Sequence, residues 1–173
     1  MTILYRSASL SSGNGRTVHG IAVPFGQVAE IFEDGRTYQE RFQQGAFARS
    51  IRERGSKVKL LTNHDARRLP VGRAVELEER PDGLHASFEV AQTRDGDDAL
   101  ELVRSGTVDA FSVGFRGLRH RMDGDVVVRT EASLWEVSLV AFPAYPGAAV
   151  AGVRSQLVIS RAIAERRLRL LDL

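Results

Sequence analysis

Three short turn sequences, each standing between apolar runs, constrain this chain most strongly to a fold built from strands. Asp34-Gly35 and Asp123-Gly124 are dipeptides that favour tight β-hairpin turns, and Pro81-Asp82-Gly83 is a third turn sequence. Few of the remaining segments are long enough for helices. The sequence therefore predicts three hairpins in a mainly β (α+β) chain, in which an antiparallel β-barrel is surrounded by a few helices.

The stretch LWEVSLVAFPA, residues 134–144, is apolar at nearly every position. Strands that are covered on both faces have almost continuous apolar sequences, so a run of this kind is typical of a central strand. We expect this strand, including Trp135, to be deeply buried.

Two internal segments combine helical spacing with the residues that begin or end helices. Residues 44–55 place Phe47 and Ile51 four positions apart and end at Gly55, while residues 95–106 carry acidic residues in their first turn. We expect each segment to form a short helix.

A third helix is predicted at the C-terminus, where no helix-breaking residue follows Gly152. We therefore divide the chain into a barrel domain, residues 1–152, and a C-terminal helical tail, residues 153–173. The apolar residues of the tail fall on two arcs, which indicates two packing partners: the barrel and a neighbouring subunit of a homodimer or higher oligomer. The alternative is that its arginines bind an acidic partner or nucleic acid.

The composition excludes several classes of function. The 24 basic and 22 acidic side chains nearly cancel, so charge gives no reason to expect a nucleic-acid partner. The absence of cysteine excludes disulfides, thiolate nucleophiles and cysteine-bound zinc, and we expect neither a metal nor another cofactor. Because no apolar segment has the length of a membrane span or the pattern of a secretory leader, we expect neither membrane insertion nor secretion.

His64 stands where an apolar strand, KVKLLTNHD, ends abruptly in polar residues. Strand ends combine a rigid support with access to substrate, and the ordinary pKa of histidine suits a general base. The alternative is a hydrogen-bonded turn residue. His19, His85 and His120 stand in ordinary strand or loop surroundings, and we expect them to be structural or solvent-facing.

Ser112 lies inside the alternating run VDAFSVGF, residues 108–115, on the same face as Ala110 and Gly114. Small neighbours leave room for a substrate backbone, and a hydroxyl inside a strand needs a hydrogen-bond partner. A neutral imidazole partner would make it a nucleophile, whereas the alternative is a serine bonded across the barrel interior. Ala110 replaces a glycine of the G-x-S-x-G pattern, which disfavours an α/β-hydrolase.

Glu136 places a carboxylate, next to the hydroxyl of Ser138, in an otherwise apolar strand. A buried carboxylate is costly unless it is paired. His64 is one candidate partner and would then be oriented as a base, while Arg73 or Arg116 is the structural alternative.

Taken together, these motifs resemble the prohead maturation proteases of tailed bacteriophages, which are related to the herpesvirus capsid protease assemblin. The resemblance covers roughly residues 16–150 and rests on GAFARSI, LTNHD, LPVGR, DAFSVGF and LWEVSLVAFPAYPGA, in this order. It implies a herpesvirus-protease-like barrel, with His64 as catalytic base and Ser112 as nucleophile. By the same resemblance, Glu136 is the third catalytic residue.

The resemblance leaves the oxyanion stabiliser open. Assemblin uses a second histidine as its third member and arginine-linked water near the oxyanion, and this chain has neither residue type at the corresponding place after Glu136, where PAYPG follows. The backbone amides of Val113 and Gly114 and the side chain of Arg116 are therefore the candidates.

The function that the resemblance implies is that of a serine endopeptidase acting inside the immature capsid, in the cytoplasm of the bacterial host. Its substrates would be the scaffold or the N-terminal scaffolding region of the major capsid protein, and the protease itself. The alternative is a non-catalytic capsid-assembly or scaffold-binding module on the same barrel. A nucleic-acid-binding barrel is disfavoured because only 7% of the residues are aromatic.

Overall fold

The computed structural model describes residues 15–33, 35–145 and 147–154. The elements in these ranges are mostly strands, and all three predicted hairpins are confirmed, as β2–β3, β5–β6 and β7–β8. In chain order the elements are β1 (Thr17–Pro24), β2 (Ala29–Glu33), β3 (Arg36–Phe42), α1 (Ala48–Arg54), the short 3-10 helix η1 (Gly55–Lys57), β4 (Lys59–Thr62), β5 (Gly72–Arg80), β6 (Gly83–Val90), α2 (Arg94–Arg104), β7 (Ala110–Asp123), β8 (Val126–Val140) and β9 (Ala149–Arg154).

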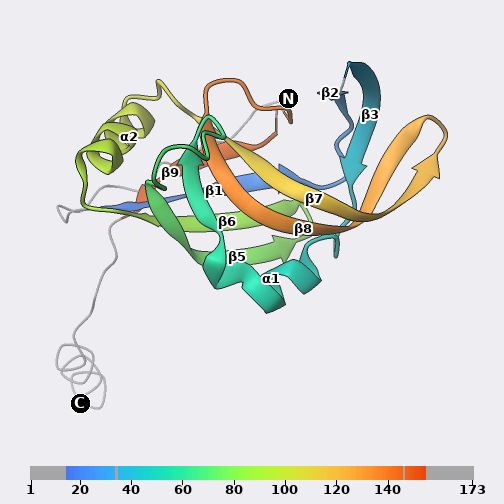
Figure 1. The fold of residues 1–173 in the computed structure, drawn as a ribbon, viewed down its shortest axis with the longest axis horizontal. Helices are drawn as coiled ribbons and strands as arrows, with labels where there is room; N and C mark the ends of the chain where they lie inside the picture. The colour runs from blue at the N-terminus through green and yellow to red at the C-terminus, as the bar shows by residue number, and fades with distance from the viewer. Residues whose placement is uncertain (1–14, 34, 146, 155–173) are drawn as a thin grey trace, which may run out of the picture.

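The described strands form one sheet in the order β2-β3-β8-β4-β5-β6-β1-β9, with β7 also paired to β8 (Figure 1). This path does not return on itself, so the mainly β class is confirmed but the closed barrel is not. The expectation of a purely antiparallel sheet was wrong, because β8 pairs in parallel with both β3 and β4. The physical reason is that α1 separates these two short strands, and a helical crossover lets both run in the direction of the long strand β8.

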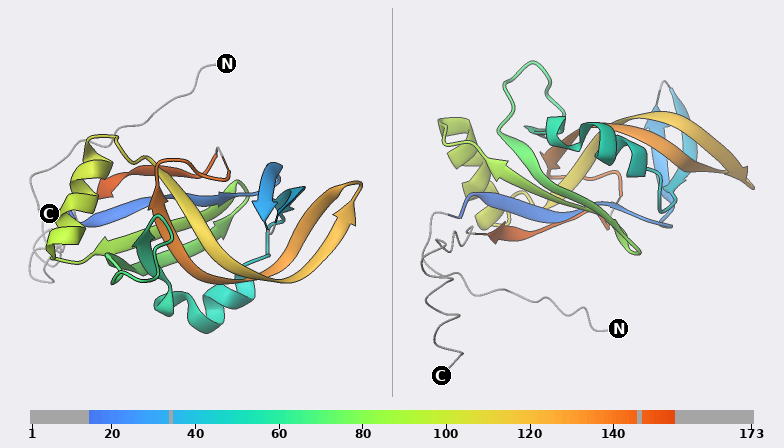
Figure 2. Two further views of the ribbon diagram at one scale, coloured as in Figure 1. Left: turned by 45° about the horizontal axis from the view of Figure 1, so that its top comes forward. Right: turned by 90° about the horizontal axis from the view of Figure 1, so that it is seen from below.

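The elements are arranged along one long axis. In Figures 1 and 2, α2 lies at one end of the molecule and the tip of the twisted β7–β8 hairpin lies at the other. Neither α-helix of the described part is long and apolar enough to cross a membrane.

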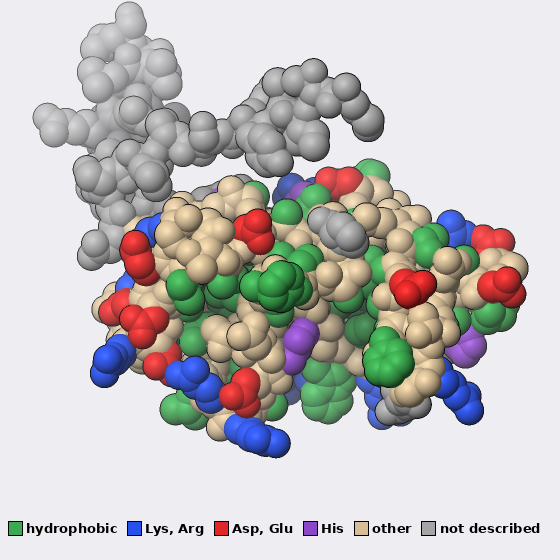
Figure 3. All heavy atoms as spheres, turned by 90° about the horizontal axis from the view of Figure 1, so that it is seen from above, with side chains coloured by type: hydrophobic (Ala, Val, Ile, Leu, Met, Phe, Trp, Pro, Cys, Tyr) green, Lys and Arg blue, Asp and Glu red, His purple; other side chains and the backbone are tan. Residues whose placement is uncertain are grey.

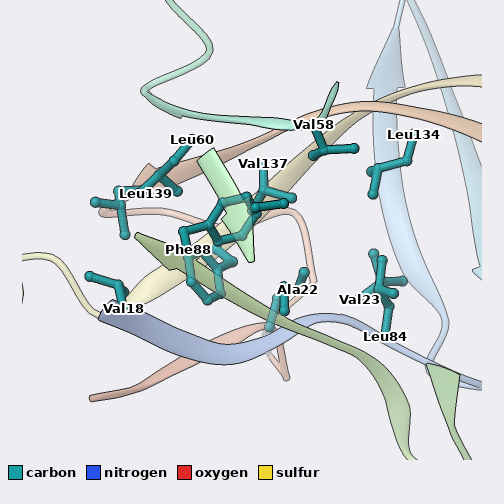
Figure 4. Close-up of a cluster of buried hydrophobic side chains, with 14 of the residues drawn as sticks. Val18, Ala22, Val23, Val58, Leu60, Leu84, Phe88, Leu134, Val137 and Leu139 are labelled. Atoms are coloured by element: carbon teal, nitrogen blue, oxygen red, sulfur yellow. The ribbon is translucent and has the colours of Figure 1, made fainter. Parts of the chain in front are cut away.

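The core is formed where β1, β4, β6 and β8 face one another. Figure 4 shows Val18, Leu60, Phe88, Val137 and Leu139 meeting there, and all five are buried. Burying a side chain of this size stabilises the fold by about 1.5–3 kcal/mol relative to leaving it exposed. This packing fixes β4 and β8 against each other, and both strands carry candidate site residues.

Of the two internal helices predicted from the sequence, one forms as expected and the other begins later than expected. Segment 95–106 is confirmed as α2, whose first turn is capped by the Thr93 hydroxyl accepting from the backbone N–H of Gly96 at 3.2 Å. The helix predicted from residue 44 begins only at Ala48, because Gly45 has a φ of 93° and the residues before Ala48 form turns.

The C-terminal tail is described only at its beginning. Val153 and Arg154, which the sequence assigns to the helical tail, belong to strand β9, where they pair with β1. Residues 155–173, and with them the predicted helix and its subunit contact, lie outside the described residues.

Trp135 is not buried as predicted, although β8 is central. The side chain is 54% exposed, whereas residues 137–140 of the same strand are buried. The guanidinium of Arg54, at the end of α1, lies 4.4 Å from the centre of the Trp135 ring. This cation–π contact stabilises the indole at the surface without burying it.

Large hydrophobic side chains also remain exposed elsewhere. Phe32 is 76% exposed, Leu69 86% and Phe142 93%. Figure 3 shows hydrophobic side chains gathered around the middle of one face, with charged side chains mostly around its edges. Exposed apolar surface of this kind is typical of interaction sites.

Candidate active site

Strand β8 holds the candidate residues in register. In the antiparallel β7–β8 pair, Ser112 lies opposite Ser138 and Gly114 lies opposite Glu136. Strand β4 runs parallel to β8 and ends beside these residues, immediately before the turn that carries His64. Residues far apart in the sequence therefore meet because three neighbouring strands bring them together.

The turn that carries His64 has an unusual backbone. Asn63 and His64 have φ values of 50° and 56°, in the left-handed region that non-glycine residues seldom adopt. For most side chains this conformation costs about 1–2 kcal/mol, and asparagine and histidine adopt it more readily than other non-glycine residues. Backbone hydrogen bonds hold it in place, from the N–H of Asn63 to the carbonyl of Leu139 at 3.0 Å and from Asp65 to Thr62 at 3.1 Å. Strain of this kind persists where the surroundings over-determine the conformation, as at many functional sites.

The imidazole of His64 connects the other two candidates. Its Nε2 lies 2.8 Å from Oγ of Ser112, and its Nδ1 lies 2.6 Å from Oε1 of Glu136. With the Nδ1 proton directed at the carboxylate, Nε2 accepts the hydrogen bond from the serine hydroxyl. The structure thus brings together all three residues that the sequence singles out, in an order that can move a proton from Ser112 to His64.

Ser138 joins the turn to the carboxylate. Its side chain is fully buried, and its hydroxyl accepts from the backbone N–H of His64 at 3.0 Å and donates to Oε2 of Glu136 at 2.8 Å. Both oxygens of Glu136 are therefore held. The sequence places this hydroxyl beside Glu136 but does not predict a role for it. The available signal was its position two residues after Glu136, which places both side chains on one face of a strand.

Gly114 makes room for the carboxylate. A Cβ atom at this position would lie 2.2 Å from Oε1 of Glu136, far closer than atoms can approach. Glycine therefore lets the carboxylate lie directly over β7 and reach His64. From the sequence, Gly114 was expected to leave room for a substrate backbone and to offer its amide to the oxyanion, and this effect on Glu136 was not predicted.

The electrostatics of the site favour proton acceptance by His64. The hydrogen bond that His64 donates to Glu136 raises the pKa of His64 above its ordinary value, although burial acts in the opposite direction. The same carboxylate stabilises the imidazolium that forms when His64 takes a proton. His64 is therefore a stronger base than a free histidine, and it is neutral only above its raised pKa.

The arginines proposed as structural partners of Glu136 lie elsewhere. Arg73 pairs with Glu89, and Arg116 lines a cavity with Arg54 and Trp135. His64 and Ser112 open instead onto another cavity, of about 520 Å³.

The three candidates for oxyanion stabilisation line two different cavities. Val113 and Gly114 line the same cavity as Ser112, whereas Arg116 lines the separate one. Among the described residues, no group of three or more acidic or histidine side chains is placed to hold a metal ion.

A family model described as caudovirus prohead serine protease matches residues 4–162, which is most of the chain. The chain belongs to this family. The prohead protease of Escherichia phage T5 is 33% identical over 86 residues, covering 49% of this chain and 40% of that protein. The prohead protease of Enterobacteria phage HK97 is 28% identical over 134 residues, covering 73% of this chain and 58% of that protein. The chain thus matches about half the length of these relatives.

Solved structures of viral proteases are also similar to this fold. A Kaposi's sarcoma herpesvirus protease gives a TM-score of 0.48 at 13% identity, over 90% of each chain. The bacteriophage T4 capsid assembly protease gives 0.47 at 9% identity, over 72% of this chain and 97% of that one.

Replacing Glu136 with glutamine is expected to lower the pKa of His64. The variant removes the negative charge that stabilises the imidazolium, so the neutral imidazole persists to lower pH than in the wild type. NMR titration of the His64 ring protons measures this shift, with the signal assigned by its loss in His64→Ala. Glu131→Gln, on the same strand but paired with Arg49 and Arg119, is the control. A pKa of His64 that is the same in Glu136→Gln and wild type would contradict the assignment.

Replacing Gly114 with alanine is expected to push the Glu136 carboxylate away from His64. The added methyl group occupies the place of Oε1, so a crystal structure of the variant should show the Nδ1 to Oε1 hydrogen bond broken. Gly55→Ala is the matched control, because a Cβ atom there lies at an ordinary 3.7 Å from its neighbours. An unchanged 2.6 Å contact in Gly114→Ala would show that the site does not need glycine here.

Proposed function

We propose that this protein is a serine endopeptidase of phage capsid maturation. The observation that carries the proposal is the continuous hydrogen-bonded chain from the Ser112 hydroxyl through His64 to the Glu136 carboxylate. This arrangement of nucleophile, base and orienting acid is one by which serine peptidases cleave peptide bonds. Membership of the prohead protease family supports the same activity.

The first half of the reaction acylates the enzyme. Oγ of Ser112 attacks the carbonyl carbon of the scissile peptide bond while Nε2 of His64 takes the hydroxyl proton. The tetrahedral intermediate collapses as His64 returns this proton to the leaving amine, which releases one product and leaves an ester on Ser112. A positioned base of this kind contributes roughly 10²–10⁴-fold to the rate.

The second half regenerates the enzyme. His64 takes a proton from water, the resulting hydroxide attacks the ester, and the carboxylic acid product leaves as Ser112 recovers its proton. Glu136 stabilises the imidazolium in both halves, and Ser138 keeps the carboxylate in position. The amides of Val113 and Gly114 are our candidates for the oxyanion, a contribution typically of about 10²–10³-fold. The mechanism uses no metal or other cofactor.

The substrates follow from the family. We propose that the protein cleaves the scaffold or the N-terminal scaffolding region of the major capsid protein, and also itself, inside the immature capsid in the cytoplasm of the bacterial host. A non-catalytic assembly module would not need His64 to be bonded to both Ser112 and Glu136, and this geometry therefore favours catalysis.

Replacing either Ser112 or His64 with alanine is expected to stop cleavage. When the protein is produced together with its capsid precursor, the wild type should shorten the precursor, while Ser112→Ala and His64→Ala should leave it full length. Glu136→Gln should slow cleavage without abolishing it, because Ser112 and His64 remain. Gel electrophoresis and mass spectrometry of the capsid protein measure the outcome.

Ser133→Ala, which removes a hydroxyl from β8 away from the site, is the matched control and should cleave like the wild type. Shortening that continues in both Ser112→Ala and His64→Ala would refute the proposed function.

A further inference from the structure

The cavity onto which Ser112 and His64 open has both apolar and polar walls. Its volume is about 520 Å³, and its lining includes Ile31, Phe111 and Phe115. Cavities of this size, apolar with a few placed polar groups, are typical of ligand sites. It is large enough to take a substrate side chain beside the reacting hydroxyl.

One part of the cavity wall is polar and is built on a buried ion pair. Glu40 is only 2% exposed, and its Oε2 accepts a hydrogen bond from Nε of Arg129 at 2.6 Å. Its Oε1 accepts from the hydroxyl of Tyr145 at 2.9 Å. Both carboxylate oxygens therefore have partners, and the charges of Glu40 and Arg129 cancel.

The protonation states of this wall are fixed. Burial raises the pKa of Tyr145, and the neighbouring Glu40 raises it further, so the phenol remains a donor. Burial lowers the pKa of Arg129, but the hydrogen bond and charge of Glu40 outweigh this effect and raise it overall. The wall consequently contains a charged guanidinium at all ordinary pH values.

Arg129 has more donors than these contacts use. Its Nη2 donates to the hydroxyl of Tyr38 at 3.3 Å, and Nη1 takes no part in the bonds to Tyr38 or Glu40. Nη1 lies against Gly117, where a Cβ atom would be 2.8 Å from it. Gly117 lines the same cavity, so no side chain at that position covers Nη1.

We propose that this cavity binds one side chain of the substrate within a few residues of the scissile bond, and that Arg129 selects an uncharged side chain with a terminal acceptor, glutamine or asparagine. The inference rests on the proposed function and adds its substrate class. A lysine would bring a second cation to Arg129, and a glutamate would add negative charge to a pair that is already neutral. A leucine would bury an N–H of Nη1 without an acceptor. A carboxamide oxygen accepts from Nη1 and leaves the charge unchanged.

Peptide cleavage tests this selection. Quenched fluorescent peptides that copy the cleaved sequence of the capsid precursor are prepared with glutamine, glutamate, leucine or lysine at each position within about five residues of the scissile bond, because Gly117 follows Ser112 by five residues along β7. At one of these positions the wild type should cleave the glutamine peptide with a kcat/KM about tenfold or more above the other three, as expected for a buried donor that needs an acceptor.

Two variants assign the preference to Arg129. Arg129→Lys keeps a cation beside Glu40 but loses the planar fork, and Gly117→Ala places a methyl group against Nη1. Each should lower kcat/KM for the glutamine peptide about tenfold more than for the leucine peptide. Arg119→Lys, which alters an exposed ion pair with Glu131, is the control and should retain the preference.

The outcomes separate this inference from the proposed function. Equal cleavage of the four peptides at every position tested, or a glutamine preference that survives in Arg129→Lys and Gly117→Ala, would overturn the subsite while cleavage itself supports the peptidase. Failure of the wild type to cleave either the peptides or the natural precursor would overturn both.

Discussion

The site depends on a single carboxylate that is held at both oxygens. Glu136 stands on the central strand β8, where one oxygen meets the imidazole of His64 and the other meets the hydroxyl of Ser138. Without these bonds, a mostly buried carboxylate would be costly, and the imidazole would be free to rotate away from Ser112. The same bonds order the turn after β4, because Ser138 also accepts from the backbone of His64. The same hydrogen bonds therefore stabilise the folded turn and orient His64 toward Ser112.

Much of this site could be predicted from the sequence because its signals are local. Asp-Gly turns specify hairpins through the backbone conformations they permit, and each of the three hairpins formed where expected. His64, Ser112 and Glu136 stood out because each is a polar side chain in or at the end of an apolar strand. The roles of Ser138 and Gly114 depend on pairing between distant strands, and one sequence does not reveal such pairing.

The predictions that were wrong also concern contacts between segments that are distant in the sequence. Trp135 remains at the surface, where Arg54 from α1 lies over its ring, a contact between segments about eighty residues apart. An antiparallel barrel was predicted, but the sheet is open and mixed. It is mixed because β3 and β4 both pair in parallel with the long strand β8. Strand pairing of this kind depends on tertiary packing more than on local preference.

A second buried carboxylate, Glu40, shows the same physical principle in the wall of the neighbouring cavity. It is neutralised by Arg129 and bonded by Tyr145, just as Glu136 is bonded by His64 and Ser138. The first network supplies a base, and the second supplies a donor that can distinguish substrates. The proximity of the two networks in one cavity links the reaction to the choice of substrate.

The central claim is that Ser112 and His64 share a proton. The most direct measurement is the rate at which a fluorophosphonate labels the protein between about pH 5 and 9, the range in which histidine titrates, with the labelled residue identified by mass spectrometry. The account predicts a label on Ser112, at a rate that rises with pH through the raised pKa of His64 and is largely lost in His64→Ala. A label on another serine, or a Ser112 rate that does not change with pH or with loss of His64, would contradict it.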